Sequence, residues 1–401
     1  MNGRISTYLG IFGVVVAGVL LAWVTSPDPK LNRASFEKTP MIERVAPLDE
    51  AITLAQFIGE NGQIVTVQVL DYTGETITGI NLTEMGASPN DHPLLALASI
   101  SAVPLSVDSV DSFPIIEMDM SMLLPSGTNG VRHIGTGTNF PEHAEEAGSQ
   151  SVFSFPKFGK ATPARTEVAA KSGILLDYEI ELCMRFDRDI TSAADFDTAL
   201  KGVFLCGDFT NRNALVELAD PDNLDSGYGF SDAKSGPDFL PTGPFLVIPK
   251  NWSSFVASLR MTTSVNEQPR QDARGAEMTL DFRQLAEKSL ADMTDQRFFY
   301  DDQFYFLAPY KRIEKNMTLM SGTSEGVIFT SPTRRDFIEG ALNYVASGGP
   351  FSKNTLIETV KQTFIRNELD SGHFLQPGDV VDYRSSYLGN IEIKVTEGVA
   401  K

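Results

Sequence analysis

The sequence predicts a mainly β protein of the α+β class, whose sheets form a barrel or a paired-sheet roll. The run Ile174–Phe186 alternates with a period of two residues, which indicates a strand with two different faces. Further apolar strands are predicted at Gly202–Asp208 and Ser258–Val265, beside turn residues. Helical spacing occurs at Phe282–Met293 and in parts of Arg335–Thr363, so short helices accompany the sheets.

The N-terminal segment, residues 1–25, is predicted to be a single-pass membrane anchor. Ile5–Val24 contains no charged residue, and about 20 helical residues span roughly 30 Å, the thickness of a bilayer's hydrocarbon core. Trp23 lies near one end, where indole rings favour the headgroup region. A cleaved signal peptide is the alternative, because Arg4 supplies a positive start. Positive charges flank both ends almost equally, so the side of the membrane stays undetermined.

Three further segments follow this anchor. Residues 26–45 are rich in proline and read as a linker. Residues 46–125 are predicted to form a small β-rich module, because Gln63–Leu70 alternates polar and apolar side chains. Residues 126–401 form the main domain, which closes on a strand at Ile391–Val395.

The composition limits the partners of the chain. Its 401 residues include 33 Lys and Arg against 52 Asp and Glu, a formal net charge of −19. Such an acidic chain repels phosphate backbones, so no nucleic-acid partner is expected. The 26 Phe and 10 Tyr residues disfavour a disordered chain.

Three carboxylates on apolar strands suggest a metal site. Glu179 and Glu181 lie two residues apart, so they share one face of a strand at about 7 Å. Asp208 ends the next strong strand. If the shared face were exposed, the pair would be an ordinary solvated alternation. If the face is buried, the carboxylates require a cation, and oxygen ligands without histidine suit Mg²⁺ or Mn²⁺.

A candidate base lies in Asn139–Gly148, which has the proline start and glycine end of a short helix. His143 and Glu146 are three residues apart and therefore share one helix face. Glu146 could orient the imidazole for proton transfer. The alternative is an ordinary surface histidine.

The same segments together resemble the fumarylacetoacetate hydrolase superfamily, with its acylpyruvase, 2-oxo acid hydrolase, hydratase and decarboxylase members. The resemblance runs from about Pro125 to Val395 and rests on motifs in the order that the superfamily uses. They are TGTNFPEHAEE, DYEIEL, the strand ending in Asp208, KSGPDFLPTGP, VNEQPRQDARGAEM, SGTSEGV and FLQPGDVV.

The resemblance implies a mixed β-sheet roll behind a smaller N-terminal domain, and a homodimer. It also implies that the three carboxylates bind a divalent cation, usually Mg²⁺, sometimes Mn²⁺ or Ca²⁺. His143 with Glu146 would activate water, and Lys234 would steady a developing enolate. Substrate contacts are expected at Gly322 and Thr323, and at Arg212, which is retained from the S-x-R-D-x-Q pattern.

Some positions depart from the superfamily. Asn213 replaces an acid, Leu215 replaces a glutamine that often points at substrate, and Pro237 replaces the acid of KSFD. Ser324 replaces the proline of TGTP, and a long insertion precedes Phe374. The residues expected to bind the metal are thus retained, while positions expected near the substrate are altered. The sequence therefore predicts retained metal chemistry on an unusual substrate.

The two cysteines, Cys183 and Cys206, lie on neighbouring predicted strands. Pairing of those strands could bring them close, but buried free thiols are the more common outcome. We therefore expect free thiols.

Two functional hypotheses follow from these residues. The first is a metal-dependent hydrolase that cleaves a C–C bond in a β-dicarbonyl or acylpyruvate-type 2-oxo acid; a hydratase, decarboxylase or isomerase would use the same site. The second is a membrane-tethered, catalytically degenerate relative that binds a ligand without turnover. The substrate expected for the enzyme is a small 2-oxo acid or β-dicarbonyl.

Overall fold

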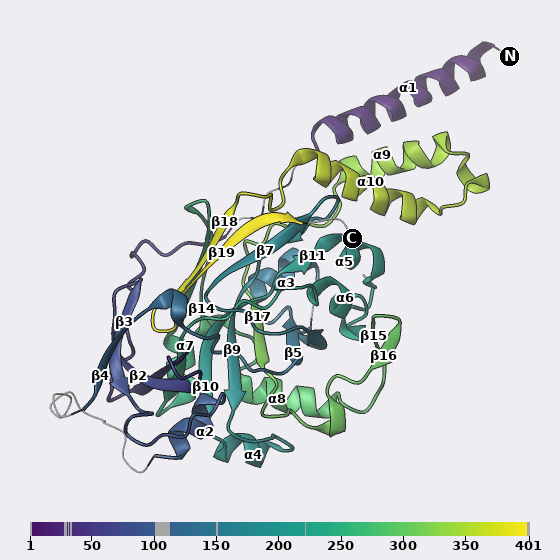
Figure 1. Cartoon of the computed structure of the whole chain (residues 1–401). Helices are drawn as coiled ribbons and strands as arrows, with labels where there is room; N and C mark the ends of the chain where they lie inside the picture. The colour runs from purple at the N-terminus through teal and green to yellow at the C-terminus, as the bar shows by residue number, and fades with distance from the viewer. Residues whose placement is uncertain are drawn as a thin grey trace. The chain divides into compact units, whose positions relative to one another are not determined.

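The computed structural model describes residues 2–27, 30, 32, 34–100, 113–149, 151–220 and 222–398 (Figure 1). The chain forms two compact units, each described by itself. The larger comprises Arg33–Val327 with Leu375–Lys401 and contains all the candidate site residues. The smaller comprises Met1–Asn32 with Ile328–Phe374.

The larger unit is built on a sheet of ten strands in the order β4-β3-β2-β1-β12-β10-β9-β17-β5-β6. Its pairs are antiparallel except that β17 runs parallel to β5, so the sheet is mixed. In chain order its strands are β1 (Ala51–Ile58), β2 (Ile64–Tyr72), β3 (Thr76–Asn81), β4 (Ile115–Asp119), β5 (Arg132–Gly137), β6 (Phe153–Phe158), β9 (Ile180–Phe186), β10 (Lys201–Gly207), β12 (Leu246–Pro249) and β17 (Leu319–Thr323).

A second sheet has five strands in the order β14-β13-β18-β19-β7, and β7, β18 and β19 run side by side in Figure 1. Its strands are β7 (Arg165–Lys171), β13 (Arg260–Val265), β14 (Gln268–Arg274), β18 (Val380–Ser385) and β19 (Gly389–Gly398). Two small sheets pair β8 (Leu176–Asp177) with β11 (Thr210–Asn211), and β15 (Phe298–Tyr300) with β16 (Gln303–Tyr305).

Short helices fill the connections between these strands. In the larger unit they are α2 (Pro93–Ala98), α3 (Pro141–Ala147), α4 (Ala193–Thr198), α5 (Arg212–Leu218), α6 (Phe230–Lys234), α7 (Trp252–Ser258) and α8 (Phe282–Ala291). The smaller unit contains α1 (Asn2–Val24), α9 (Arg334–Ala346) and α10 (Leu356–Ser371). Large mixed sheets with short helices confirm the predicted α+β class.

The strands of the predicted N-terminal module belong to the same sheet as the strands of the predicted main domain. β1 pairs with β12 over four residues, from Ala51 opposite Pro249 to Leu54 opposite Leu246. The hydrogen bonding of the sheet is thus continuous between the two segments. The domain boundaries proposed from sequence stay predictions, and residues 101–112 lie outside the described part of the chain.

The predicted membrane anchor is wrong. Within the described residues, no helix combines the length and the apolarity that a bilayer crossing requires. Trp23, expected at a headgroup interface, instead donates a 2.8 Å hydrogen bond from Nε1 to Glu339 Oε1 on α9. The guanidinium of Arg335 also lies over its ring.

The expectation of free thiols is also wrong, because Cys183 on β9 and Cys206 on β10 form a disulfide. In the antiparallel register of these strands, Cys183 lies opposite Phe204 and Cys206 lies opposite Glu181. The two cysteines are therefore diagonal neighbours with their Cα atoms 5.9 Å apart, within bonding range. Both are fully buried.

Candidate metal and catalytic site

The site begins with the pairing of β9 and β10 in the middle of the large sheet. Every residue of both strands is buried, so neither face of β9 is the solvated face that a two-residue alternation commonly indicates. Regular strand structure is interrupted between β8 and β9, and Glu179 lies in this interruption. Asp208 follows the last residue of β10. The amide of Asp208 donates a 2.9 Å hydrogen bond to the carbonyl of Glu179.

This pairing brings the three predicted metal ligands together. Glu179, Glu181 and Asp208 are all buried, and one carboxylate oxygen from each lies within 4.8 Å of the others. Such a group of negative charges in a protein interior is strongly unfavourable unless cations compensate it.

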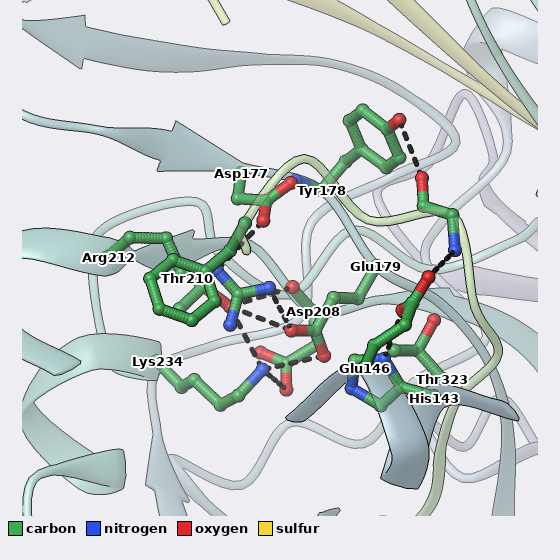
Figure 2. A network of polar contacts seen from close by, with 12 residues as sticks. His143, Glu146, Asp177, Tyr178, Glu179, Asp208, Thr210, Arg212, Lys234 and Thr323 are labelled. Atoms are coloured by element: carbon green, nitrogen blue, oxygen red, sulfur yellow. Dashed lines mark hydrogen bonds and ion pairs between the residues drawn. The ribbon is translucent and has the colours of Figure 1, made fainter. Parts of the chain in front are cut away.

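Two cations bind Glu179 from neighbouring helices, as Figure 2 shows. Lys234, the last residue of α6, places Nζ 2.7 Å from Glu179 Oε2 and 2.9 Å from Asp208 Oδ2. Arg212, the first residue of α5, donates to Glu179 Oε1 and to Asp177 Oδ2, both at 2.8 Å. Burial alone would raise the pKa of Glu179, but Lys234, Arg212 and His143 lower it to about 2. Glu179 is therefore ionised.

A third cation, Lys157 on β6, was not singled out from the sequence. Its Nζ donates to Asp208 Oδ1 at 2.6 Å and also to the carbonyl of Lys234. Both side chains of this ion pair are completely buried. The available signal was the spacing of β6, because Phe153, Phe155 and Lys157 alternate and therefore lie on one face of the strand.

Glu181 differs from the other two carboxylates. Its Oε2 accepts a 2.9 Å hydrogen bond from the amide of Gly322, whereas Oε1 is buried and has no hydrogen-bond partner among the described residues. Burial, and then the charges of Asp208 and Glu179, raise the pKa of Glu181 well above its usual range. Among the described residues, Glu181 Oε1 thus has neither a hydrogen bond nor an ion pair, whereas Asp208 Oδ2 has the ammonium of Lys234.

These observations fit a divalent metal ion. The donors are three carboxylates, which are hard oxygen ligands suited to Mg²⁺, Mn²⁺ or Ca²⁺. A cation at this point would bind Glu181 Oε1. It would also offset the repulsion from Asp208 and Glu179 that disfavours the ionised form of Glu181. The carboxylates expected to bind metal are therefore those that the fold brings together.

The structure also brings His143 and Glu146 into contact, as the sequence predicted. His143 and Glu146 lie on α3, which starts at Pro141 and ends at Gly148 with a left-handed φ of 67°. His143 Nδ1 lies 3.1 Å from Glu146 Oε2, and the two side chains are 12% and 14% exposed. An electrostatic contribution from His143 also lowers the pKa of Glu179, and the pair lies beside the carboxylates (Figure 2).

The predicted substrate-binding loop begins at the end of β17. Gly322 has φ of +79°, a conformation that favours glycine, and its amide is the donor to Glu181 Oε2. Thr323 Oγ1 donates to the carbonyl of Ile180 at 2.8 Å and accepts from Gln271 Nε2 at 2.9 Å. Gln271 on β14 therefore supports the loop, although the sequence had assigned it no role.

One of the departures from the superfamily pattern, Asn213, has a local structural role. Asn213 Oδ1 accepts from the amide of Leu175, and its Nδ2 donates to the carbonyl of Gly173, both at 2.8 Å. Pro237 lies in an exposed turn. Asn213 thus stabilises the turn that leads into β8.

Comparisons with known proteins show the family to which the chain belongs. Residues 132–396 match the family described as fumarylacetoacetate (FAA) hydrolase C-terminal. No curated protein matches the chain.

Solved structures share the fold. A fumarylacetoacetate hydrolase from Exiguobacterium antarcticum is 16% identical with a TM-score of 0.54, and the match covers 86% of this chain and 100% of that one. A probable 2-hydroxyhepta-2,4-diene-1,7-dioate isomerase from Mycobacterium abscessus is 18% identical with a TM-score of 0.52, covering 87% and 100%. The matching structures therefore include a hydrolase and an isomerase by name.

Proposed function

Because the chain belongs to the fumarylacetoacetate hydrolase family, we propose that it is a divalent-metal-dependent hydrolase. Its substrate is a β-dicarbonyl or acylpyruvate-type 2-oxo acid, in which it cleaves a C–C bond. The observation that carries the proposal is the buried group of Glu179, Glu181 and Asp208 beside the His143–Glu146 pair.

The three carboxylates are the proposed metal ligands. When bound there, Mg²⁺, Mn²⁺ or Ca²⁺ supplies a Lewis acid that polarises the oxygens of the substrate. Both carboxylate oxygens of Asp208 bind a lysine, Oδ1 to Lys157 and Oδ2 to Lys234. Both oxygens of Glu179 likewise bind a cation, Oε1 to Arg212 and Oε2 to Lys234. The protein thereby fixes the orientation of two of the ligands.

The His143–Glu146 pair is the proposed base. In this arrangement Glu146 accepts a hydrogen bond from Nδ1–H, which leaves Nε2 as the unprotonated nitrogen. Nε2 takes a proton from water while the water oxygen forms a bond to the carbonyl carbon. The C–C bond then breaks, its electron pair leaves with the other fragment as an enolate, and the imidazolium returns the proton to that fragment's carbon.

Lys234 is the proposed stabiliser of the enolate charge. Its ammonium lies between Glu179 and Asp208 at the centre of the site (Figure 2). Burial alone would lower the pKa of Lys234, but Asp208 and Glu179 raise it above its usual range. The lysine is therefore a permanent positive charge rather than a base.

Thr323, Gly322 and Arg212 remain the proposed substrate contacts. Each already has a partner: Arg212 binds Asp177 and Glu179, and the Gly322 amide binds Glu181. A homodimer is proposed as the assembly.

The proposal is tested by incubating the purified protein with acylpyruvates and oxaloacetate, with and without Mg²⁺ or Mn²⁺, and identifying the products. Acid fragments from an acylpyruvate support hydrolysis. Pyruvate and carbon dioxide from oxaloacetate, or a shifted double bond without cleavage, identify a decarboxylase or an isomerase. Glu179→Ala and Asp208→Ala should abolish metal-dependent turnover, whereas Glu167→Ala, an exposed acid on β7, should not. Unchanged turnover in the first two variants would remove the metal assignment.

A further inference from the structure

Tyr178 is linked to the catalytic pair through a single glycine. The Tyr178 hydroxyl donates a 3.0 Å hydrogen bond to the carbonyl of Gly326. The amide of the same glycine donates a 3.1 Å hydrogen bond to Glu146 Oε1. The other carboxylate oxygen of Glu146 is the partner of His143 Nδ1 at 3.1 Å, so these contacts form one continuous chain (Figure 2).

Gly326 is held tightly at this junction. Its φ of +95° is a conformation that side chains with Cβ atoms rarely adopt. A Cβ atom there would meet the carbonyl oxygen of Arg270 at 2.1 Å, far inside contact distance. The loop therefore passes close against β14, and in this arrangement its amide points at Glu146.

Tyr178 is well suited to hold that loop. It is 1% exposed and lies between the end of β8 and the start of β9, directly before Glu179. The side chain is thus enclosed, and its hydroxyl is the donor to the Gly326 carbonyl. One residue thus connects the backbone that carries a proposed metal ligand with the loop that supports Glu146.

We propose that Tyr178 is a positioning residue for the proposed general base: through Gly326 it fixes Glu146, which holds His143 in the tautomer with the proton on Nδ1. This inference rests on the proposed function, in which Nε2 of His143 receives the proton of water. Without the tyrosine hydroxyl, the loop is less constrained and Glu146 loses a fixed donor. A part of the His143 population then has the proton on Nε2, and this tautomer cannot act as the base.

The test compares Tyr178→Phe with the wild type in the presence of Mg²⁺. The first readout is the ¹⁵N chemical shift of the imidazole nitrogens in histidine-labelled protein. The chain has four histidines, and His143→Gln identifies the signals of His143. We expect the wild type to show the Nδ1–H tautomer, and Tyr178→Phe to show a mixture with the Nε2–H tautomer. Tyr387→Phe, a matched change at a tyrosine that binds Arg44, should leave the signals unchanged.

The second readout is kinetic. Loss of one positioning hydrogen bond should lower kcat about tenfold, with KM changed less than twofold. In a Glu146→Gln background, Tyr178→Phe should produce no further loss of kcat, because its effect acts through Glu146. A thermal melt shows whether each variant is folded.

Unchanged His143 signals in folded Tyr178→Phe overturn the inference, as does a loss of kcat that is fully additive with Glu146→Gln. These outcomes are distinguishable from failure of the proposed function. If no β-dicarbonyl or 2-oxo acid is turned over, the hydrolase proposal fails, whereas the nitrogen shifts still decide whether Tyr178 controls the tautomer of His143.

Discussion

Lys157 donates a 2.6 Å hydrogen bond from its ammonium to Asp208 Oδ1, and both side chains are completely buried. Burial lowers the pKa of Lys157, although Asp208 acts in the opposite direction. A buried ion pair of this kind is costly to break, because the remaining partner is left as an uncompensated charge. The pair therefore couples the stability of the fold to the geometry of the proposed metal site.

Lys157→Met should lower the free energy of unfolding by about 3 kcal/mol, because it removes the ammonium and leaves Asp208 with Lys234 alone. Urea denaturation measures this change. Lys160→Met is the matched control, since Lys160 is exposed just beyond the same strand, and it should change stability by less than about 0.5 kcal/mol. Equal stabilities of the two variants would show that the buried pair contributes nothing net.

Metal binding should depend on Glu181, the carboxylate with an unsatisfied buried oxygen. Saturating Mg²⁺ or Mn²⁺ at about 100 times Kd should stabilise the wild type by about 2.7 kcal/mol, seen as a rise in Tm. Glu181→Gln should abolish this rise, and Glu167→Gln on β7 should retain it. A full rise in Glu181→Gln would contradict the assignment of this residue as a ligand.

Stability should fall as the pH falls from 6.5 to 4, partly because of His133. Burial lowers the pKa of His133 to about 4, and its ring accepts from the Thr318 amide at Nδ1 while Nε2 lies 2.9 Å from the Gly159 carbonyl. The folded state keeps this histidine neutral where the unfolded state binds a proton, so unfolding is favoured as the pH decreases. The maximum loss is about 3 kcal/mol.

Urea denaturation across this range checks the effect. His133→Gln should have a shallower dependence on pH, although His92, whose pKa burial also lowers to about 4, retains part of the slope. His373→Gln, at a histidine outside the core, should follow the wild type. The idea fails if His133→Gln and the wild type lose stability in parallel.

The disulfide should contribute about 3 kcal/mol to stability, because it closes a loop with a sequence separation of 23 residues. Denatured protein should contain no titratable thiol until a reductant is added. Cys183→Ser/Cys206→Ser should unfold at lower urea, and a reductant should no longer change its midpoint. Two free thiols in the untreated protein would contradict the disulfide.

Many of the elements could be predicted because their signals are local. The alternation of Ile174–Phe186, the proline and glycine that bound α3, and the turn residues before β18 and β19 all act within a few residues. The candidate site followed from the same kind of signal. Glu179 and Glu181 lie two apart near a strand, and His143 and Glu146 lie three apart on a helix, so their proximity needs no distant contact.

Other features depend on segments that are far apart in sequence. The alternation of β9 suggested a solvated face as readily as a buried one, and only packing on both sides excluded that interpretation. The disulfide required the register of β9 and β10, in which Cys183 and Cys206 become diagonal neighbours. The apolar N-terminal run predicted a membrane anchor, but Trp23 binds α9, and hydropathy carries no information on such a contact.

The sequence by itself determined the class of fold, the three carboxylates and the His143–Glu146 pair, because strand and helix periods place these groups on common faces. The tertiary structure decided how they are supported. Lys157 reaches Asp208 from β6, and Gly326, more than a hundred residues along the chain from both Tyr178 and Glu146, links those two side chains. Such contacts depend on which strands become neighbours, and that is settled by burial of the whole apolar surface rather than by local pattern.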